Sequence, residues 1–150
     1  MELTTTRTLT AIFSEVLANL AFLFTDDEET EPALGEVWLE TSISYHGPVS
    51  GTLRFRCTRS FCELLAANLL GIDPDDEAAA RQSEDAVREF MNIVCGQFVT
   101  SMHGSDDVYN LSIPHTVELP ETPDLADDGG KTSSTLSVDH HVVQLIYEPK

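Results

Sequence analysis

Apolar residues in the first part of the chain recur at helical spacing. Over Thr6–Phe24 they return every three or four positions, which predicts one amphipathic helix. A second helix is predicted from Ser60, the first residue of a capping box, to Gly71, a residue type common at helix ends. The third helix covers Ser83–Met102, and Asp73-Pro74 opens a linker or an extra helical turn before it.

The remaining apolar residues mostly alternate with polar ones, which is typical of strands. The predicted strand segments are Glu36–Tyr45, Ser50–Cys57, Val108–Ile113, Thr116–Leu119 and a hairpin over Ser134–Tyr147 that turns near Asp139-His140. Residues 120–131, rich in Pro, Asp and Gly, are predicted to form a mobile loop. This order of elements predicts an α/β (α+β layered) fold, with a mostly antiparallel sheet and helices packed on one face.

Length and charge narrow the possible functions. A chain of 150 residues is predicted to form a single domain, residues 1–150. Its formal net charge of −18 argues against nucleic acid and anionic membranes as partners, because both attract basic surfaces. The N-terminus lacks the features of a signal peptide and no apolar stretch is long enough to cross a bilayer, so we expect a cytoplasmic protein.

Cysteine and histidine supply no metal-site pattern. Cys57, Cys62 and Cys95 are odd in number and lack paired spacing, so we expect them to be buried as small apolar residues. His140 and His141 are adjacent, and neighbouring strand residues face opposite sides, so we expect a turn or a surface position.

The third predicted helix has two contrasting faces. One is an apolar core stripe: Val87, Phe90, Met91, Val94, Phe98 and Met102. The other carries four residues along one line, at spacings of four, three and four: Asp85, Glu89, Asn92 and Gly96. A solvated surface is the simple explanation. However, Gly inside a helix costs about 1 kcal/mol relative to Ala, and an outward Gly96 suits the close approach of another backbone.

These residues also form a recognisable spaced pattern. Asp85, Glu89 and Asn92, with Pro114 twenty-two positions after Asn92, resemble the signature of the CheC/CheX/FliY chemotaxis phosphatases. The similarity continues through Gly96 and can be followed from about Ile12 to Tyr147. The resemblance therefore implies a CheC/CheX-like fold for nearly the whole chain.

Within that family the chain looks most like CheX, which keeps only one active helix. The first helix has Glu15, but Ala18 stands where Asn is required, and Asn19 comes one residue late, rotated by roughly 100°. The position of the distant Pro is taken by Glu40. Met91 replaces a Gly found in many relatives, and because it projects toward the core stripe we expect altered packing there.

The resemblance implies an activity and a role for each residue. The chain would hydrolyse the aspartyl phosphate of a phosphorylated CheY-type response regulator in bacterial chemotaxis. Asn92 would orient the attacking water, and Glu89 would pair with a lysine of the receiver domain. Asp85 and Gly96 would contribute to partner binding, and Pro114 would shape a supporting strand. No cofactor of its own is expected, because Mg²⁺ belongs to the receiver.

Two other functions stay open at this point. One is a non-catalytic receiver-binding or flagellar-switch-like scaffold of the same fold, and the other is a regulatory domain of an unrelated two-component pathway. We also expect a homodimer. Relatives pair their sheets, Val142–Tyr147 is strongly β-prone, and one layer of helices leaves apolar faces uncovered.

Overall fold

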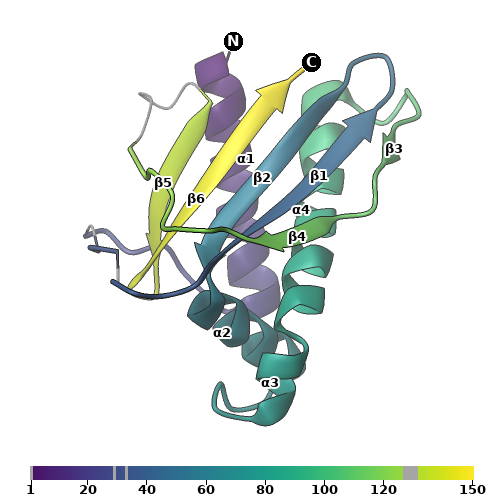
Figure 1. The fold of residues 1–150 in the computed structure, drawn as a ribbon. Coiled ribbons are helices and arrows are strands. Elements are labelled where there is room, and N and C mark those ends of the chain that lie inside the picture. Colours follow the sequence, from purple (N-terminus) through teal and green to yellow (C-terminus); the bar gives the residue numbers. More distant parts are fainter. Residues whose placement is uncertain (1, 29, 33, 127–131) are drawn as a thin grey trace.

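One antiparallel sheet with its helices behind it makes up the molecule (Figure 1). The computed structural model describes residues 2–28, 30–32, 34–126 and 132–150. The sheet has six strands in the order β3-β1-β2-β6-β5, and β4 also pairs with β1. Every pairing is antiparallel, and α1, α2 and α4 lie on one side of the sheet. The predicted fold class is therefore confirmed.

The strands fall in the predicted segments, but β3 has only two residues where Val108–Ile113 was predicted. Their bounds are β1 Trp38–His46, β2 Gly51–Thr58, β3 Asn110–Leu111, β4 His115–Glu118, β5 Ser133–Val138 and β6 His141–Pro149. The turn between β5 and β6 falls at Asp139 and His140, as predicted, and both have positive φ (47° and 65°). Two positive φ values in a two-residue loop match the right-handed twist of a hairpin.

The first helix differs from its prediction at both ends. Helix α1 spans Glu2–Val16, and a π-helical turn, η1, continues it over Leu17–Ala21. The helix therefore begins before Thr6 and does not reach Phe24. The side chain of Asn68 donates a hydrogen bond to the Ala21 carbonyl (2.7 Å), which satisfies one of the acceptors that a helix end leaves open.

Helix α2, Arg59–Leu70, begins one residue earlier than predicted because a different residue caps it. Thr58 Oγ1 accepts a hydrogen bond from the Phe61 N–H (3.2 Å), so Thr58 is the N-cap and the Ser60 capping box is wrong. Ser60 instead donates to a carboxylate oxygen of Glu36. The other end agrees with the prediction, since Gly71 closes the helix with φ 70°.

A short helix leads into the long one. Helix α3, Glu77–Arg81, is capped by Asp76, whose carboxylate accepts from the Ala78 N–H (2.9 Å), so the extra helical turn is present. Helix α4 covers Ser83–His103 and stops at Gly104 (φ 76°). Among the described residues no helix is long and apolar enough to span a membrane.

The core fills the space between the helices and the sheet. Aromatic rings join the layers, since Phe13 of α1 contacts Phe55 of β2 (centroids 5.1 Å apart) and Phe90 of α4 (5.4 Å). All three side chains are fully buried. Burial of this kind holds α4 against the sheet and fixes which of its faces is outward.

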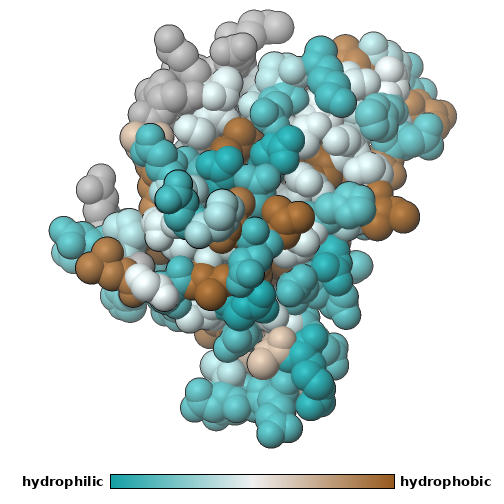
Figure 2. All heavy atoms as spheres, viewed as in Figure 1, coloured by the Kyte–Doolittle hydropathy of each residue, from teal (hydrophilic) through white to brown (hydrophobic). Residues whose placement is uncertain are grey.

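The opposite face of the sheet is polar, contrary to the expectation of an uncovered apolar face. Glu40 accepts hydrogen bonds from Arg54 (3.0 Å) and Arg56 (2.7 Å), and Arg54 also binds Glu148. The hydrogen bond to Glu148 is the main cause that raises the pKa of Arg54 above its usual value. Figure 2 views this side, where hydrophilic and neutral residues surround isolated apolar ones. The charges explain how this face can remain in water.

The long loop after β4 lies partly against the sheet. The Leu125 carbonyl accepts from Thr135 Oγ1 (2.7 Å), and the Asp124 carbonyl accepts from the Gln144 amide (3.4 Å). Residues 127–131 of the predicted mobile loop lie outside the described residues.

Candidate functional site

Helix α4 presents the four predicted site residues on its outward side. Asp85, Glu89 and Asn92 are exposed, and Gly96 is half-buried. The predicted core stripe is buried on the inward side, including Met91 at 0% exposure, and only Met102 remains partly accessible. The helical periodicity in the sequence therefore placed these residues correctly.

The first residue of the pattern, Asp85, neither caps the helix nor bonds to Glu89. Gln82 holds the N-cap position, and the Asp85 carboxylate pairs with the guanidinium of Arg88. Arg88 also lies 3.7 Å from Glu84. Arg88 was not predicted as part of this face, although its spacing of three and four residues from two acids is the usual sign of ion pairs on a helix.

The side chains of Glu89 and Asn92 are free to bind another molecule. Within the described part of the chain, neither side chain has a hydrogen bond or an ion pair, and both are exposed. They lie three residues apart and so are neighbours on the helix surface. A carboxylate accepts only, whereas a side-chain amide both donates and accepts. The pair can therefore bind a cation and, one turn away, position a small polar molecule without adding a second negative charge.

A shallow groove continues from Asn92 toward the C-terminal end of α4. Its lining residues are Asn92, Ile93, Gly96, Gln97, Thr100 and Ser101. A Cβ atom built on Gly96 would meet no heavy atom within 4 Å. No contact among the described residues therefore requires Gly there, although Gly disfavours a helix by about 1 kcal/mol relative to Ala. The groove gives another molecule's backbone access to the helix beside Asn92.

Pro114 lies at the edge of the sheet, in a break between β3 and β4. Three positions separate Ser42 from Tyr45 on β1, whereas four separate their partners Leu111 and His115. The additional residue makes a β-bulge, which bends the edge strand locally. Both short strands contact α4 as well as β1, so this edge supports the outward helix from the side.

Serine residues satisfy the backbone at this break. The Ser44 N–H donates to Ser112 Oγ (2.9 Å), and the Ser112 N–H donates to the Ser44 carbonyl (2.8 Å). Pro114 has no N–H to contribute to a ladder, and a bulge is one of the few places where a sheet accepts it. Its place agrees with a role in shaping the strand.

The first helix offers a weaker version of the same surface. Glu15 and Asn19 are both exposed, but Asn19 lies within the π turn η1. Each residue of a π turn rotates less than a residue of an α-helix, so the expected 100° displacement of Asn19 is too large. The exposed Phe22 stands seven residues after Glu15, as Gly96 does after Glu89. A bulky side chain therefore replaces the open glycine.

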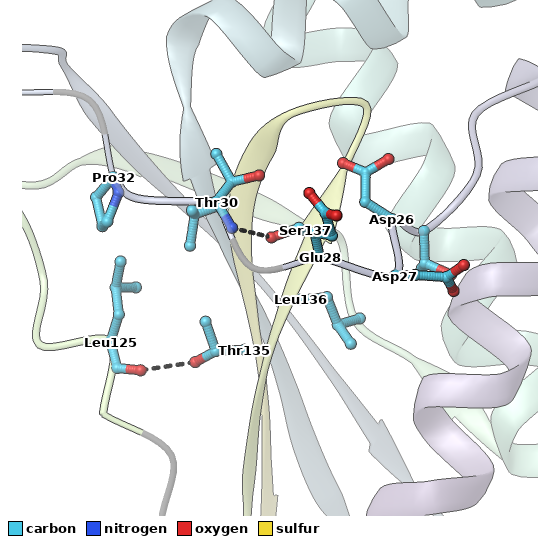
Figure 3. A pocket seen from close by; sticks show the side chains of 11 residues that line it. Asp26, Asp27, Glu28, Thr30, Pro32, Leu125, Thr135, Leu136 and Ser137 are labelled. Carbon is cyan, nitrogen blue, oxygen red and sulfur yellow. Dashed lines mark hydrogen bonds between the residues drawn. The ribbon is translucent and has the colours of Figure 1, made fainter.

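A second cavity lies at the other edge of the sheet, beside β5 (Figure 3). It has a volume of ≈ 400 Å³, and residues 25–28, Thr30 and Pro32 form one wall, with Asp26, Asp27 and Glu28 at its rim. The Thr30 N–H donates to Ser137 Oγ (3.0 Å) and ties this wall to β5. No group of three or more potential metal ligands occurs among the residues that the structure describes.

Cysteine and histidine take the positions that the sequence predicts. All three cysteines are buried and free, and burial raises the pKa of the Cys95 thiol to about 12. A thiol with such a pKa stays protonated at neutral pH and is not a nucleophile. His140 lies in the β5–β6 turn with an exposed side chain, and His141 is half-buried just after it.

Comparison with known proteins places this geometry in a family. A family model described as "Chemotaxis phosphatase CheX" matches residues 40–137. A search of curated proteins gave no match. The fold is similar to that of a chemotaxis protein CheX from Desulfovibrio desulfuricans, at 13% identity and a TM-score of 0.71, covering 98% of this chain and 99% of that one.

Two further solved structures share the fold. One is the CheX-CheY-BeF3-Mg+2 complex from Borrelia burgdorferi, at 20% identity and a TM-score of 0.62, with 96% of each chain covered. The other is chemotaxis protein CheX from Vibrio vulnificus, at 18% identity and a TM-score of 0.66, covering 97% of this chain and 99% of that one. At these identities the structures show a common fold, and the family model carries the assignment.

Proposed function

Because the chain belongs to the chemotaxis phosphatase CheX family, we propose that it hydrolyses the aspartyl phosphate of a phosphorylated CheY-type receiver. One observation carries the proposal. Glu89 and Asn92 are exposed neighbours on α4, and neither side chain has a hydrogen bond or an ion pair among the described residues. The similar fold of a CheX-CheY complex supports a CheY-type protein as the partner.

The reaction asks little covalent chemistry of the protein. A water attacks the phosphorus in line, the bond between phosphorus and the receiver's carboxylate oxygen breaks, and inorganic phosphate leaves. Positioning and electrostatics dominate such phosphoryl transfers. The side-chain carbonyl of Asn92 accepts a hydrogen bond from the water. This bond orients the water so that a lone pair of the water oxygen points at phosphorus. An amide does this without a negative charge that would repel the phosphoryl oxygens.

Glu89 anchors the helix to the receiver. Its carboxylate pairs with the lysine of the receiver's active site, and the helix spacing then carries Asn92 to the phosphoryl group one turn later. A charge-assisted hydrogen bond excluded from water contributes about 1.5–3 kcal/mol. The Mg²⁺ ion that offsets the phosphate charge is held by the receiver and not by this chain.

The neighbouring residues prepare the face for docking. Arg88 pairs with Asp85 and Glu84, so these two acids are partly neutralised and Glu89 is the acid of this face that stays free for the receiver's lysine. Gly96 leaves room for the receiver's backbone, because a Cβ atom there would meet no heavy atom of the described residues within 4 Å. Pro114 and its bulge support α4 from the edge of the sheet.

The test is the decay of receiver phosphorylation with and without the protein. Wild type should accelerate the loss of phosphate from its receiver, and Asn92→Ala should remove at least nine-tenths of the gain while its circular dichroism stays unchanged. A double change of Glu15 and Asn19 to Ala is the matched control and should keep activity near wild type. Decay that wild type leaves unaltered, across the receivers encoded with it, would support a scaffold instead.

Binding measurements separate the two side chains. Titration against a receiver carrying a beryllofluoride phosphate mimic should show weaker binding for Glu89→Ala and nearly wild-type binding for Asn92→Ala. The reason is that Glu89 contacts the receiver itself, whereas Asn92 acts on the water. Equal losses in both variants would contradict this division of roles.

A further inference from the structure

The end of the first helix exposes three large apolar side chains that lie close together in the sequence. Leu20 is 40% exposed, Phe22 72% and Phe24 63%. Between the two aromatic residues, Leu23 is buried at 4%. Alternation along this segment therefore directs Leu23 into the core and both phenylalanines into solvent. We call Leu20, Phe22 and Phe24 the aromatic patch.

The backbone holds the patch rigidly. Phe22 adopts a left-handed conformation (φ 54°), which is rare for an aromatic residue, and its N–H donates to the Leu17 carbonyl. Asn68 binds the Ala21 carbonyl just before it. On the other side, the Asp26 N–H donates to the Ser137 carbonyl (2.7 Å). The segment is pinned at both ends, so the exposure of its rings is built into the fold.

The strained backbone and the exposed ring of Phe22 do not stabilise the fold. A glycine would relieve the backbone at Phe22, and a polar residue would be better solvated. Strained residues that persist are concentrated at functional sites. Exposed aromatic side chains of this kind supply much of the binding energy at protein interfaces.

Charge decides what can cover the patch. Asp27 and Glu28 lie three and four residues after Phe24, and Glu15 lies five residues before Leu20. All three are exposed, and we call them the acidic rim. The whole chain carries a formal net charge of −18. A second copy would bring the same acidic rim against itself, and an anionic membrane would be repelled. A basic surface would be attracted by the rim and steered to it.

We propose that the aromatic patch docks a basic, amphipathic segment of a partner protein, with apolar side chains on the phenylalanines and Lys or Arg against the acidic rim. Leu20 lies in η1 and Phe22 and Phe24 follow it, so the patch is not on α4 and this docking is separate from the proposed phosphatase site. It gives the protein a second attachment point while Glu89 and Asn92 remain open.

The test uses a fluorescent peptide of about eighteen residues in which leucine and lysine alternate with helical period. Its anisotropy is measured in titrations with the full chain. The double variant Phe22→Ser/Phe24→Ser should bind at least tenfold more weakly. The matched control Leu34→Ser/Val49→Ser removes two apolar side chains that are 98% and 45% exposed elsewhere, and it should bind within twofold of wild type.

Further arms identify what the patch recognises. A peptide of equal charge with serine in place of leucine should bind at least tenfold more weakly, and Asp27→Lys/Glu28→Lys should weaken binding of the original peptide several-fold. Equal affinity of the Phe22→Ser/Phe24→Ser variant and wild type would overturn the proposal, as would no binding at all. Unchanged circular dichroism establishes that each variant is folded.

Two controls address other occupants. If sedimentation shows that wild type is a dimer and the patch variant a monomer, the patch is a self-interface and the proposal fails. It also fails if the patch drives binding to vesicles of anionic lipid. Receiver dephosphorylation by the patch variant should equal that of wild type, so failure of the phosphatase proposal and failure of this one remain distinguishable.

Discussion

Substitutions at Gly96 should stabilise the fold, and a large side chain there should also reduce the activity. A Cβ atom at this position would meet no heavy atom within 4 Å, and Gly96 lies in the interior of α4. Gly96→Ala should therefore stabilise the fold by up to about 1 kcal/mol through helix propensity alone. For a chain of this size that corresponds to a rise of about 2–4 °C in Tm. Thermal unfolding followed by circular dichroism measures it.

The same site should lose function as the side chain grows. Gly96→Leu keeps a good helix former but fills the groove beside Asn92, so receiver dephosphorylation should fall at least tenfold, a loss of about 1.4 kcal/mol. The measurement is the rate of receiver phosphate loss at a fixed concentration of the variant.

Gly71→Ala is the matched control, because its Cβ would also meet nothing but its φ of 70° is unfavourable for Ala. This variant should lose about 1 kcal/mol of stability and keep its activity. A stable Gly96→Leu protein with wild-type activity would show that the receiver does not approach this face.

Three other predictions follow from the fold. Phe22→Gly should raise the free energy of unfolding by about 0.5–1 kcal/mol, because relief of the left-handed strain outweighs the added entropy of the unfolded chain. Denaturant titration measures this change. A destabilised variant would show that the Phe22 ring makes stabilising contacts. Glu40→Gln should cost about 1 kcal/mol in the same titration, because Arg54 and Arg56 lose their shared carboxylate, an effect limited by the solvent exposure of both arginines. A homodimer paired through sheet edges should tighten as salt rises, because salt screens −18 charges per chain; sedimentation showing a monomer at micromolar concentration in both low and moderate salt would rule it out.

Local pattern was enough to predict the helix that carries the site. The apolar stripe of α4 repeats at helical spacing, so a single projection separates buried Phe90 and Met91 from exposed Glu89 and Asn92. The strands and the β5–β6 turn were predictable for the same reason, because alternation and turn residues act over a few positions. The family resemblance rested on the same short-range spacing.

Contacts between distant segments decided the rest. Asn68 of α2 binds the carbonyl of Ala21, and the π turn that ends there shifts Asn19 in a way that no α-helical projection predicts. The bulge at Pro114 depends on the register of two short strands against β1. The open face of the sheet is polar because Glu40, Arg54 and Glu148 come from three different strands. Periodicity reports which side chains share a face, but only the packed structure determines which face another element covers.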